Sequence, residues 1–561
     1  MKTPTTSLLK NLSSILSKIQ MKHLLFGVIL LTVVTRCIGL EKLPLYWEEV
    51  ALGFDAYSLL QTGMDHHGNH LPFPHLPSFG DYKPAVYAYV MIPFLALFDL
   101  SSFAVRAPSA LAGVLTVYFV YQLGRKLVNK NLGLLAAFFL AIQPWALHLS
   151  RVGFETNLAT LFIVVGVWGL IGEKDRPATM IEATIGIVAL ILSMATYQAT
   201  KISAPLLGLL LLPFWIRSWN QILSKNVLIP MLLGVVFLIP VLVSAFESTS
   251  SIRLAQTTWL GSPQIAQRSN EMRELDPSFL GRLLSHRYLL TGEELLARYL
   301  QGYNLRFFFL HGDDNARHQP GLHGLLWHLD MLLIPLGLFW LWNSSKSSAV
   351  LIGGWILIAG LPQALTTVSP HTLRFATASP AFAVLSSAGA IHLWILSKKL
   401  ELFKGGMYAK RFNMITRALG LLTVIVVFGW QMLSFGFDYS IGYPVRAGKD
   451  WQEGYQELYD FLSRYDEPVV ITREQGRPAM YAWFMQKTNP RLVQQNAKDA
   501  ARDQLEYLEY DNYSFVDAVP YNPGQLVASS PEKTLPGAEI LHSVTRRDGV
   551  MVWQVWRLNA N

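Results

Sequence analysis

Long apolar runs constrain this 561-residue chain more than any other feature of its sequence. A helix needs about 20 mostly apolar residues to cross a bilayer core of about 30 Å, because it rises about 1.5 Å per residue. Eleven segments approach this length, at residues 22–40, 104–123, 132–149, 156–172, 180–197, 201–216, 226–245, 326–343, 349–366, 373–396 and 414–436. The sequence therefore predicts an α-helical polytopic membrane protein with about 11 transmembrane helices.

Composition narrows the class of protein further. Charged residues make up 15% of the chain, whereas soluble domains carry about 25%, so an ordinary soluble enzyme is excluded. The net charge is +8, but the basic residues lie between apolar segments, and no nucleic-acid partner is expected. The single cysteine, Cys37, allows neither an internal disulfide nor a thiolate metal cluster. Any metal site would therefore use His, Asp and Glu.

Basic residues predict the orientation, because Lys and Arg are enriched in short cytoplasmic loops. The segment 1–21 contains Lys2 and Lys10 and no acidic residue, which predicts a cytoplasmic N-terminus. The other basic short loops then fall on the same side, provided that the apolar stretch 85–100 does not cross. This stretch is short and contains Pro93, so it is predicted to be an interfacial helix at the outer face. The expected location is a prokaryotic plasma membrane.

The chain divides into three predicted parts. After the segment 1–21, residues 22–436 form a transmembrane domain with outer loops at 41–84 and 246–325. Residues 437–561 contain Asp, Glu, Arg and Tyr throughout, and they predict a soluble extracytoplasmic α/β domain. Its periodic stretches predict two helices and four strands, at 451–464, 477–487, 468–472, 514–519, 525–529 and 551–558.

Charged pairs at the outer ends of predicted helices are candidate catalytic groups. Glu48 and Glu49 follow the first apolar run. Adjacent carboxylates raise each other's pKa, which suits a general base, but acids are also favourable in the first turn of a helix. Arg151 and Glu155 stand four residues apart at the next outer turn. They could pair along a helix, or bind an anionic headgroup and a hydroxyl acceptor.

Further cationic residues in the outer loops are candidate phosphate ligands. Lys83 lies among aromatic residues at the start of the predicted interfacial helix, where it can meet a lipid phosphate or snorkel. Arg317, His318 and Arg374 also lie where the chain returns to the bilayer. An Arg at this depth needs an anionic partner. These three residues are therefore predicted to donate hydrogen bonds to a phosphate.

A metal site is an alternative use of the same loops. Asp81, His311 and Asp313 are candidate contacts to an acceptor or to a divalent metal. A site built from His311, Asp313 and His318 has suitable ligand types, but its spacing matches no compact ligand motif. Metal dependence therefore stays open.

Taken in order, several motifs make the chain similar to a known superfamily. It resembles the GT-C integral-membrane glycosyltransferases, in the branch of protein O-mannosyltransferases and lipid A aminoarabinose transferase. The motifs are Trp47-Glu48-Glu49, Gly80-Asp-Tyr-Lys83-Pro84, Phe103-Ala-Val-Arg106-Ala-Pro-Ser-Ala-Leu-Ala-Gly-Val-Leu115, Leu123-Gly-Arg125 and Gln143-Pro-Trp-Ala-Leu-His148-Leu-Ser-Arg151-Val-Gly-Phe-Glu155. The likeness covers about the first 175 residues well and the helices to residue 436 loosely.

The resemblance implies a polyprenyl- or dolichyl-phosphate sugar donor and an acidic base just after the first membrane span. The family's acidic pair is usually Asp-Glu, whereas this chain has Glu48-Glu49. By the same resemblance, Lys83 would contact the lipid phosphate, and Glu155 would position the acceptor or assist a metal.

These residues predict a membrane glycosyltransferase of the cell envelope. It would move a sugar from a polyprenyl-phosphate-linked donor to a hydroxyl of a protein, lipid or glycan, with inversion. Glu48 would act as the base, while Lys83, Arg151 and Arg374 would stabilise the departing phosphate. Two alternatives stay open: a transporter or flippase for a lipid-linked sugar, and a catalytically inactive GT-C-like scaffold.

Overall fold

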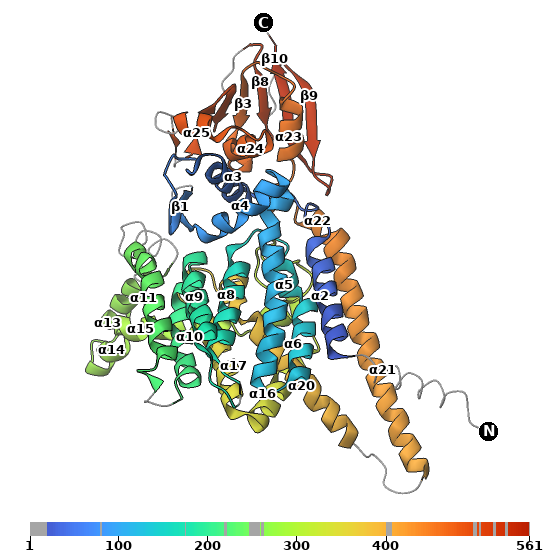
Figure 1. Ribbon diagram of the computed structural model, residues 1–561. Coiled ribbons are helices and arrows are strands. Elements are labelled where there is room, and N and C mark those ends of the chain that lie inside the picture. The colour runs from blue at the N-terminus through green and yellow to red at the C-terminus, as the bar shows by residue number, and fades with distance from the viewer. Residues whose placement is uncertain are drawn as a thin grey trace, which may run out of the picture.

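The computed structural model describes residues 20–78, 81–173, 175–217, 221–245, 258–259, 263–399, 407–496, 502–503, 506–519, 523–532 and 537–559. Nearly all of the predicted N-terminal segment 1–21, with Lys2 and Lys10, lies outside these residues. Within them the chain forms a helical bundle that carries a domain with a mixed sheet at one end (Figure 1). We call the end of the bundle that carries this domain the outer face.

Each of the eleven predicted apolar runs contains a helix of the bundle. These helices are α2 (Met21–Cys37), α5 (Ser102–Leu127), α6 (Lys130–Ile142), α7 (Pro144–Leu149), α8 (Glu155–Leu170), α9 (Met180–Thr196), α10 (Thr200–Trp215), α11 (Lys225–Ala245), α16 (Asp330–Ser344), α17 (Lys346–Ala359), α18 (Leu361–Ala364), α19 (Thr372–Phe375), α20 (Ser379–Lys399) and α21 (Met407–Phe437). Five helical segments of the described residues are long and apolar enough to cross a membrane. The chain is an integral membrane protein, and the number of crossings stays a prediction.

The predicted run 132–149 is not one helix. It divides into α6, of 13 residues, and the short α7, with Gln143 in an extended conformation between them. Pro144 explains the break, because proline has no N–H and disfavours the helical conformation of the residue before it. Helix α7 follows the break and contains His148, which contacts the carbonyl of Arg317.

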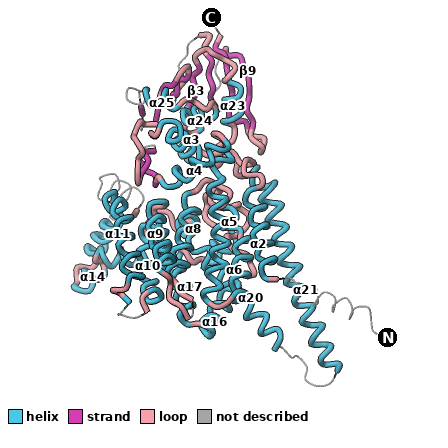
Figure 2. Tube along the Cα trace, viewed as in Figure 1, coloured by secondary structure: helices cyan, strands magenta, loops and turns pink. Residues whose placement is uncertain are grey.

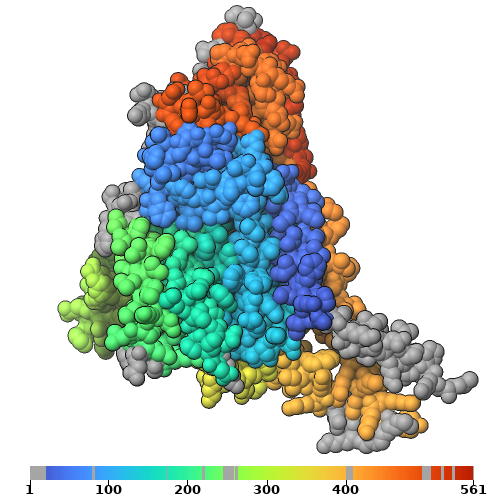
Figure 3. Space-filling model, in the orientation of Figure 1, coloured from blue at the N-terminus to red at the C-terminus, as the bar shows by residue number. Residues whose placement is uncertain are grey.

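A second layer lies between the bundle and the sheet domain. It contains α3 (Trp47–Thr62), the hairpin of β1 (His75–Ser78) and β2 (Asp81–Pro84), and α4 (Val86–Phe98). The stretch 85–100 thus forms the predicted short helix, and its 13 residues fall below the roughly 20 that a crossing needs. Figure 3 shows this blue layer directly beneath the orange and red C-terminal domain.

The described part of the loop 246–325 is largely helical. It contains α13 (Pro263–Leu275), α14 (Phe279–Leu284), α15 (Arg287–Gln301) and the π-helix η2 (Phe307–His311). Helix α15 packs against α13 and α18. Figure 1 shows α13 to α15 at the flank of the bundle. The segment after η2 contacts residues of the outer face, because the carbonyls of Ala316 and Arg317 bind Tyr443 and His148.

The C-terminal domain is built on a six-stranded mixed sheet in the order β6-β7-β3-β8-β10-β9. Figure 2 shows its strands in magenta above the cyan bundle. The strands are β6 (Glu509–Tyr510), β7 (Tyr513–Val516), β3 (Val469–Thr472), β8 (Leu526–Ser529), β10 (Met551–Leu558) and β9 (Ala538–Thr545). Strand β3 runs parallel to β7 and β8, whereas β10 is antiparallel to β8 and β9. The residue pairs β4 (Arg502–Asp503) and β5 (Glu506–Tyr507) form a separate two-stranded ladder.

The strands and helices predicted for this domain are present, and the structure adds further helices and strands that were not predicted. Helices α23 (Tyr455–Leu462) and α24 (Pro478–Met485) lie within the two predicted helical stretches, and α25 (Pro490–Asn496) follows them. Strand β9 was missed, because it pairs only with β10 at the edge of the sheet and alternates weakly. Central β3 is buried at all four positions, which explains its continuous apolar run.

The C-terminal domain is docked on α3. The phenol of Tyr481 donates to the carbonyl of Leu45 at 2.9 Å, and the Trp47 N–H donates to Gln452 Oε1 at 2.8 Å. Phe484 of α24 packs so closely on Gly53 that a Cβ there would lie 2.8 Å from its ring. The domain therefore holds the helix on which Glu48 and Glu49 stand.

Substitution of Gly53 by alanine is expected to destabilise this contact. The added Cβ would lie 2.8 Å from both Phe484 and Val105, and such overpacking costs about 1–3 kcal/mol. Thermal unfolding of the purified protein in detergent should show a lower midpoint. Gly429→Ala in α21 is the matched control, because its Cβ would meet nothing within 4 Å. Equal midpoints for the two variants would contradict the docking described here.

Candidate functional site at the outer face

Glu49 forms a buried ion pair. Arg106 Nε donates to Glu49 Oε1 at 2.7 Å and Arg106 Nη2 donates to Oε2 at 2.6 Å, and both side chains have 0% exposure. The Gly153 N–H also donates to Oε1, at 2.7 Å. The remaining Arg106 donors bind the carbonyls of Leu40, Leu43 and Pro44. Glu49 thus holds α3, α5 and the turn before α8 together.

Glu48 points the other way. Consecutive residues on a helix are about 100° apart, so one member of the pair is buried while Glu48 is exposed. The phenol of Tyr46 donates to Glu48 Oε2 at 3.1 Å. Glu48 is therefore the member of the acidic pair that can meet a ligand at the outer face.

Four of the predicted charged residues lie close enough to Tyr46 to act on it electrostatically. Its side chain is 2% exposed. Burial raises the pKa of this phenol well above its usual value, and Glu48, Glu49 and Glu155 raise it further, while Arg317 lowers it. The guanidinium of Arg317 lies 5.1 Å from the centre of the Tyr46 ring. Glu48 of α3 and Arg317 of the segment after η2 thus contact Tyr46, and the ring of Phe154, the residue before Glu155, lies 5.6 Å from the Tyr46 ring.

The segment that carries Arg317 is held by the outer ends of two helices. His148 Nε2 donates to the Arg317 carbonyl at 2.8 Å, and His148 Nδ1 accepts from the Tyr439 hydroxyl at 3.1 Å. The Tyr443 hydroxyl donates to the carbonyl of Ala316 at 2.7 Å. These bonds fix the backbone on which Arg317 and His318 stand.

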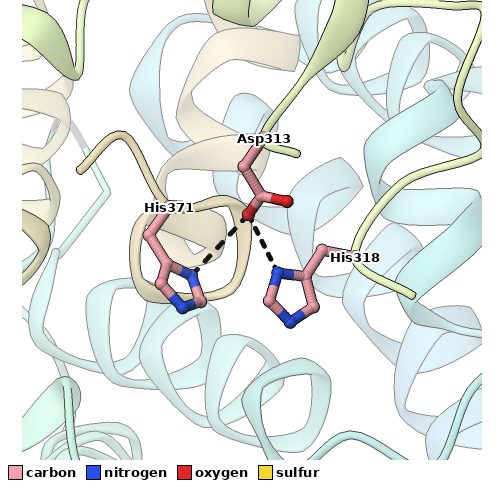
Figure 4. A group of neighbouring side chains, drawn as sticks. All are labelled: Asp313, His318 and His371. Carbon is pink, nitrogen blue, oxygen red and sulfur yellow. Dashed lines mark hydrogen bonds and ion pairs between the residues drawn. The ribbon is translucent and has the colours of Figure 1, made fainter. Parts of the chain in front are cut away.

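In the same stretch after η2, Asp313 lies close to two histidines (Figure 4). Asp313 Oδ2 accepts from His318 Nδ1 at 2.9 Å and from the Thr372 N–H at 2.8 Å. His371 Nδ1 lies 3.8 Å from the same oxygen. One ligand atom from each of the three side chains lies within 4.8 Å of the others, so the group could bind a metal. The trio contains His371 in place of the predicted His311, which is exposed and outside it.

The protonation states of this group follow from its surroundings. Burial by itself raises the pKa of Asp313, but His318, His371 and the Thr372 N–H together hold it below its usual range. Burial lowers the pKa of His371 well below its usual value, and Arg374 and His318 lower it further. At neutral pH, Asp313 is therefore a carboxylate and His371 a neutral imidazole.

Arg151 caps the C-terminus of α2. Its guanidinium donates to the carbonyls of Thr35 at 2.7 Å, Ile38 at 2.8 Å and Gly39 at 2.9 Å, which suits a cation at a helix C-terminus. Of the two alternatives for Arg151 and Glu155, pairing along one helix does not fit, because Arg151 lies between α7 and α8 and α8 begins at Glu155.

Arg151 also lines a groove between α2 and α21. This groove has a volume of about 360 Å³. Its walls are mostly apolar and include Leu31, Val34, Met432 and Phe435. A cation in the wall of an otherwise apolar groove is suited to an anionic lipid.

The remaining predicted residues lie around the same face. Lys83 is buried on β2, opposite Leu76 of β1. Helix α4 begins three residues later, at Val86. Arg374 on α19 donates to the Val368 carbonyl at 3.5 Å. The Thr156 hydroxyl donates to the Leu373 carbonyl at 3.0 Å, so α19 meets the first turn of α8. The side chain of Asp81 lies outside the described part of the structure.

A second cavity, missed by the sequence reasoning, lies where the C-terminal domain meets the start of α3. It has a volume of about 330 Å³, and its lining includes Trp47, Arg317, Gln452, Arg473 and Trp553. The residues come from distant parts of the chain, so no local motif signals this cavity. The motif Phe103–Leu115 did contain Arg106, but an arginine in an apolar run does not reveal its partner.

The helical bundle with charged residues at its outer face agrees with the resemblance to the GT-C membrane glycosyltransferases that the sequence motifs indicate. Residues 82–244 match the family model for dolichyl-phosphate-mannose-protein mannosyltransferase, which confirms the predicted resemblance to this superfamily. The match covers less than a third of the chain, so it shows a similarity of this segment to that family. No curated protein matches it in sequence.

The chain is also similar to solved structures. ArnT from Cupriavidus metallidurans bound to undecaprenyl phosphate has 12% identity and a TM-score of 0.50, over 94% of this chain and 97% of ArnT. The apo state of ArnT has 10% identity and a TM-score of 0.50, over 95% and 97%. The oligosaccharyltransferase AglB from Archaeoglobus fulgidus, in complex with an inhibitory peptide and a dolichol-phosphate, has 14% identity and a TM-score of 0.46, over 83% of this chain and 63% of AglB. The likeness to ArnT shows a common fold.

Proposed function

We propose that the protein transfers a sugar from a polyprenyl-phosphate-linked donor to an acceptor hydroxyl at the outer face, with inversion at the anomeric carbon. The observation that carries this proposal is the meeting of Glu48, Glu155 and Arg317 around Tyr46. The exposed carboxylate of Glu48 and the half-buried one of Glu155 lie beside an arginine, so a base for the acceptor and a partner for the phosphate occur in one place.

In the proposed reaction, Glu48 takes the proton of the acceptor hydroxyl. The acceptor oxygen attacks the anomeric carbon, and the bond between this carbon and the phosphate oxygen breaks. The electron pair of that bond leaves with the polyprenyl phosphate, and a single displacement inverts the configuration. Arg317, Lys83 and Arg374 stabilise the negative charge on the phosphate, while Glu155 orients the acceptor.

The two cavities support separate entry of donor and acceptor. The apolar groove between α2 and α21 suits a prenyl chain, with Arg151 near the phosphate. The cavity under the C-terminal domain has aromatic and charged walls, including Trp47 and Arg473, and it shares Arg317 with the candidate site. Such walls suit a hydroxyl-bearing polar acceptor.

The direct test uses the purified full chain in detergent with synthetic polyprenyl-phosphate sugars. Peptide, glycan and lipid hydroxyls are offered as acceptors, and mass spectrometry follows released polyprenyl phosphate and glycosylated product. NMR of the product gives its anomeric configuration. Movement of the lipid-linked sugar across vesicles without cleavage of the glycosidic bond would instead support a flippase. Mass spectrometry of lipid-linked sugars and glycans from a knockout strain would identify the natural substrates.

Replacement of Arg317 by alanine is expected to lower turnover. The loss of one donor that stabilises developing charge typically costs about 10²–10³-fold, and Arg317→Lys should retain part of the activity because it keeps the charge. Initial rates at saturating donor measure this effect. The control is Arg268→Ala, which removes an exposed arginine paired with Glu293 at 3.6 Å on the flanking helices. A wild-type rate for Arg317→Ala would exclude the phosphate role.

A further inference from the structure

We propose that Asp313, His318 and His371 bind one divalent transition-metal ion of the zinc class. The ligands come from two segments, the stretch after η2 and the turn before α19. Figure 4 shows both imidazoles turned toward one carboxylate oxygen of Asp313. The proposal concerns binding, and it stands independently of the glycosyltransferase function.

The distances within the group bracket those of a metal site. Around a tetrahedral zinc ion with bonds of about 2.0–2.1 Å, neighbouring ligand atoms lie about 3.3 Å apart. The distance from Asp313 Oδ2 is 2.9 Å to His318 Nδ1 and 3.8 Å to His371 Nδ1. Shifts of about half an ångström in each side chain would bring both to the tetrahedral spacing. The ion would replace the proton that His318 now shares with the carboxylate.

One ring nitrogen of the group lacks a hydrogen bond. His371 Nδ1 is buried and has no hydrogen-bond partner among the described residues, because its 3.8 Å distance from Asp313 Oδ2 is too long. A buried polar atom left without a partner costs about 1–3 kcal/mol. A bound ion would satisfy this nitrogen, whereas a purely structural Asp-His hydrogen bond requires only His318.

The ligands are held in place without the ion. The Asn315 N–H donates to Asp313 Oδ1 at 3.0 Å, and Gln319 Nε2 donates to the Asp313 carbonyl at 3.0 Å. The His371 N–H donates to Gln363 Oε1 at 3.0 Å. Such outer contacts orient metal ligands and raise affinity. The group is therefore already ordered for binding.

The ligand types select the metal. Two imidazoles and one carboxylate suit zinc and neighbouring transition metals, whereas magnesium and calcium prefer oxygen ligands. Three protein ligands leave a fourth position open to water or to a ligand. If the proposed function holds, the ion would also fix Arg317 and Arg374, which stand one and three residues from His318 and His371.

The experiment measures zinc binding to the full chain, purified without a histidine tag and stripped with a chelator. Equilibrium dialysis against zinc sulfate, read by elemental mass spectrometry, gives stoichiometry and affinity. We expect one tight ion per chain. Asp313→Asn and His371→Ala should each weaken it by at least about 10–100-fold, the range found even for outer-shell changes. His311→Ala is the matched control and should bind as the wild type does, since His311 lies outside the group.

The chain has 14 histidines, so the outcome depends on the variants and on the coordination geometry. Cobalt added to the stripped wild-type protein should give the intense visible absorption of a tetrahedral site, and His371→Ala should lose it. Thermal unfolding of the metal-free variants checks that they are folded. No tight ion in the wild type, or an equal affinity in Asp313→Asn, would overturn the proposal. Because no sugar donor is present, failure of the glycosyltransferase proposal would leave this result unchanged.

Discussion

Replacement of Glu48 by glutamine is expected to lower turnover by about 10²–10⁴-fold, the usual contribution of a general base. Glutamine has nearly the shape of glutamate and can still accept the hydrogen bond of the Tyr46 hydroxyl, but it cannot take a proton. Affinity for the polyprenyl-phosphate donor should stay unchanged, because Glu48 contacts the acceptor in the proposed reaction. Initial rates and donor binding, measured separately, would test both parts.

The control for this variant is Glu457→Gln in the C-terminal domain. Glu457 Oε1 lies 3.2 Å from His542 Nε2, and neither residue belongs to the candidate site. It should have wild-type activity. A wild-type rate for Glu48→Gln would remove the base assignment, and Glu155 would be the next candidate. A folded Glu48→Gln protein that binds donor but does not turn over is the result that distinguishes catalysis from structure.

Replacement of Glu49 by alanine is expected to destabilise the fold by about 3–5 kcal/mol, the cost of leaving one charge of a buried pair without its partner. Arg106 would stay buried beneath the outer face with 0% exposure. The Gly153 N–H would also lose its acceptor. Thermal unfolding in detergent should show a large fall in midpoint, and less protein should be recovered from membranes.

The matched control is Glu173→Ala. Glu173 pairs with Arg125 at 3.4 Å, with 45% and 39% of the two side chains exposed, and surface pairs of this kind contribute about 0–1 kcal/mol. A double variant, Glu49→Leu with Arg106→Met, should recover part of the lost stability, because an apolar pair avoids the buried charge. If Glu49→Ala and Glu173→Ala unfolded at the same temperature, the buried pair would not hold α3 in place.

The two predictions assign opposite roles to neighbouring residues. Sequence reasoning treated Glu48 and Glu49 as one acidic pair of candidate catalytic groups and chose Glu48 as the base. The structure separates them, because a helical step turns one inward to Arg106 and the other outward to Tyr46. We therefore propose a catalytic role for the exposed carboxylate, whereas the buried one holds the fold together.

The apolar runs were predictable because hydropathy is a local property of each helix, whether its side chains pack in the bundle or, as on α21, lie mostly at its surface. The same holds for β3, β8 and β10 in the C-terminal domain, whose runs of apolar residues are local signals. Elements at edges and breaks were harder. Strand β9 has only one neighbour, and the run 132–149 contains a break at Gln143 that hydropathy alone does not show.

The candidate site was predictable in its types of residue and less so in their partners. Arg317 and Glu155 were expected at one face, and the structure brings both near Tyr46. Arg151 instead caps α2, and His371 takes the place expected of His311 beside Asp313 and His318. The buried partner of Glu49 was not expected, because Arg106 stands 57 residues away.

The sequence by itself determined the helical membrane class, the family resemblance and the kinds of charge at the outer face, since hydropathy and motifs are local properties of the chain. The tertiary structure alone decided which carboxylate is exposed, which histidine joins Asp313, and where the two cavities open. These features depend on contacts between segments that are distant in sequence, and such contacts form only when the bundle, α3 and the C-terminal domain pack together.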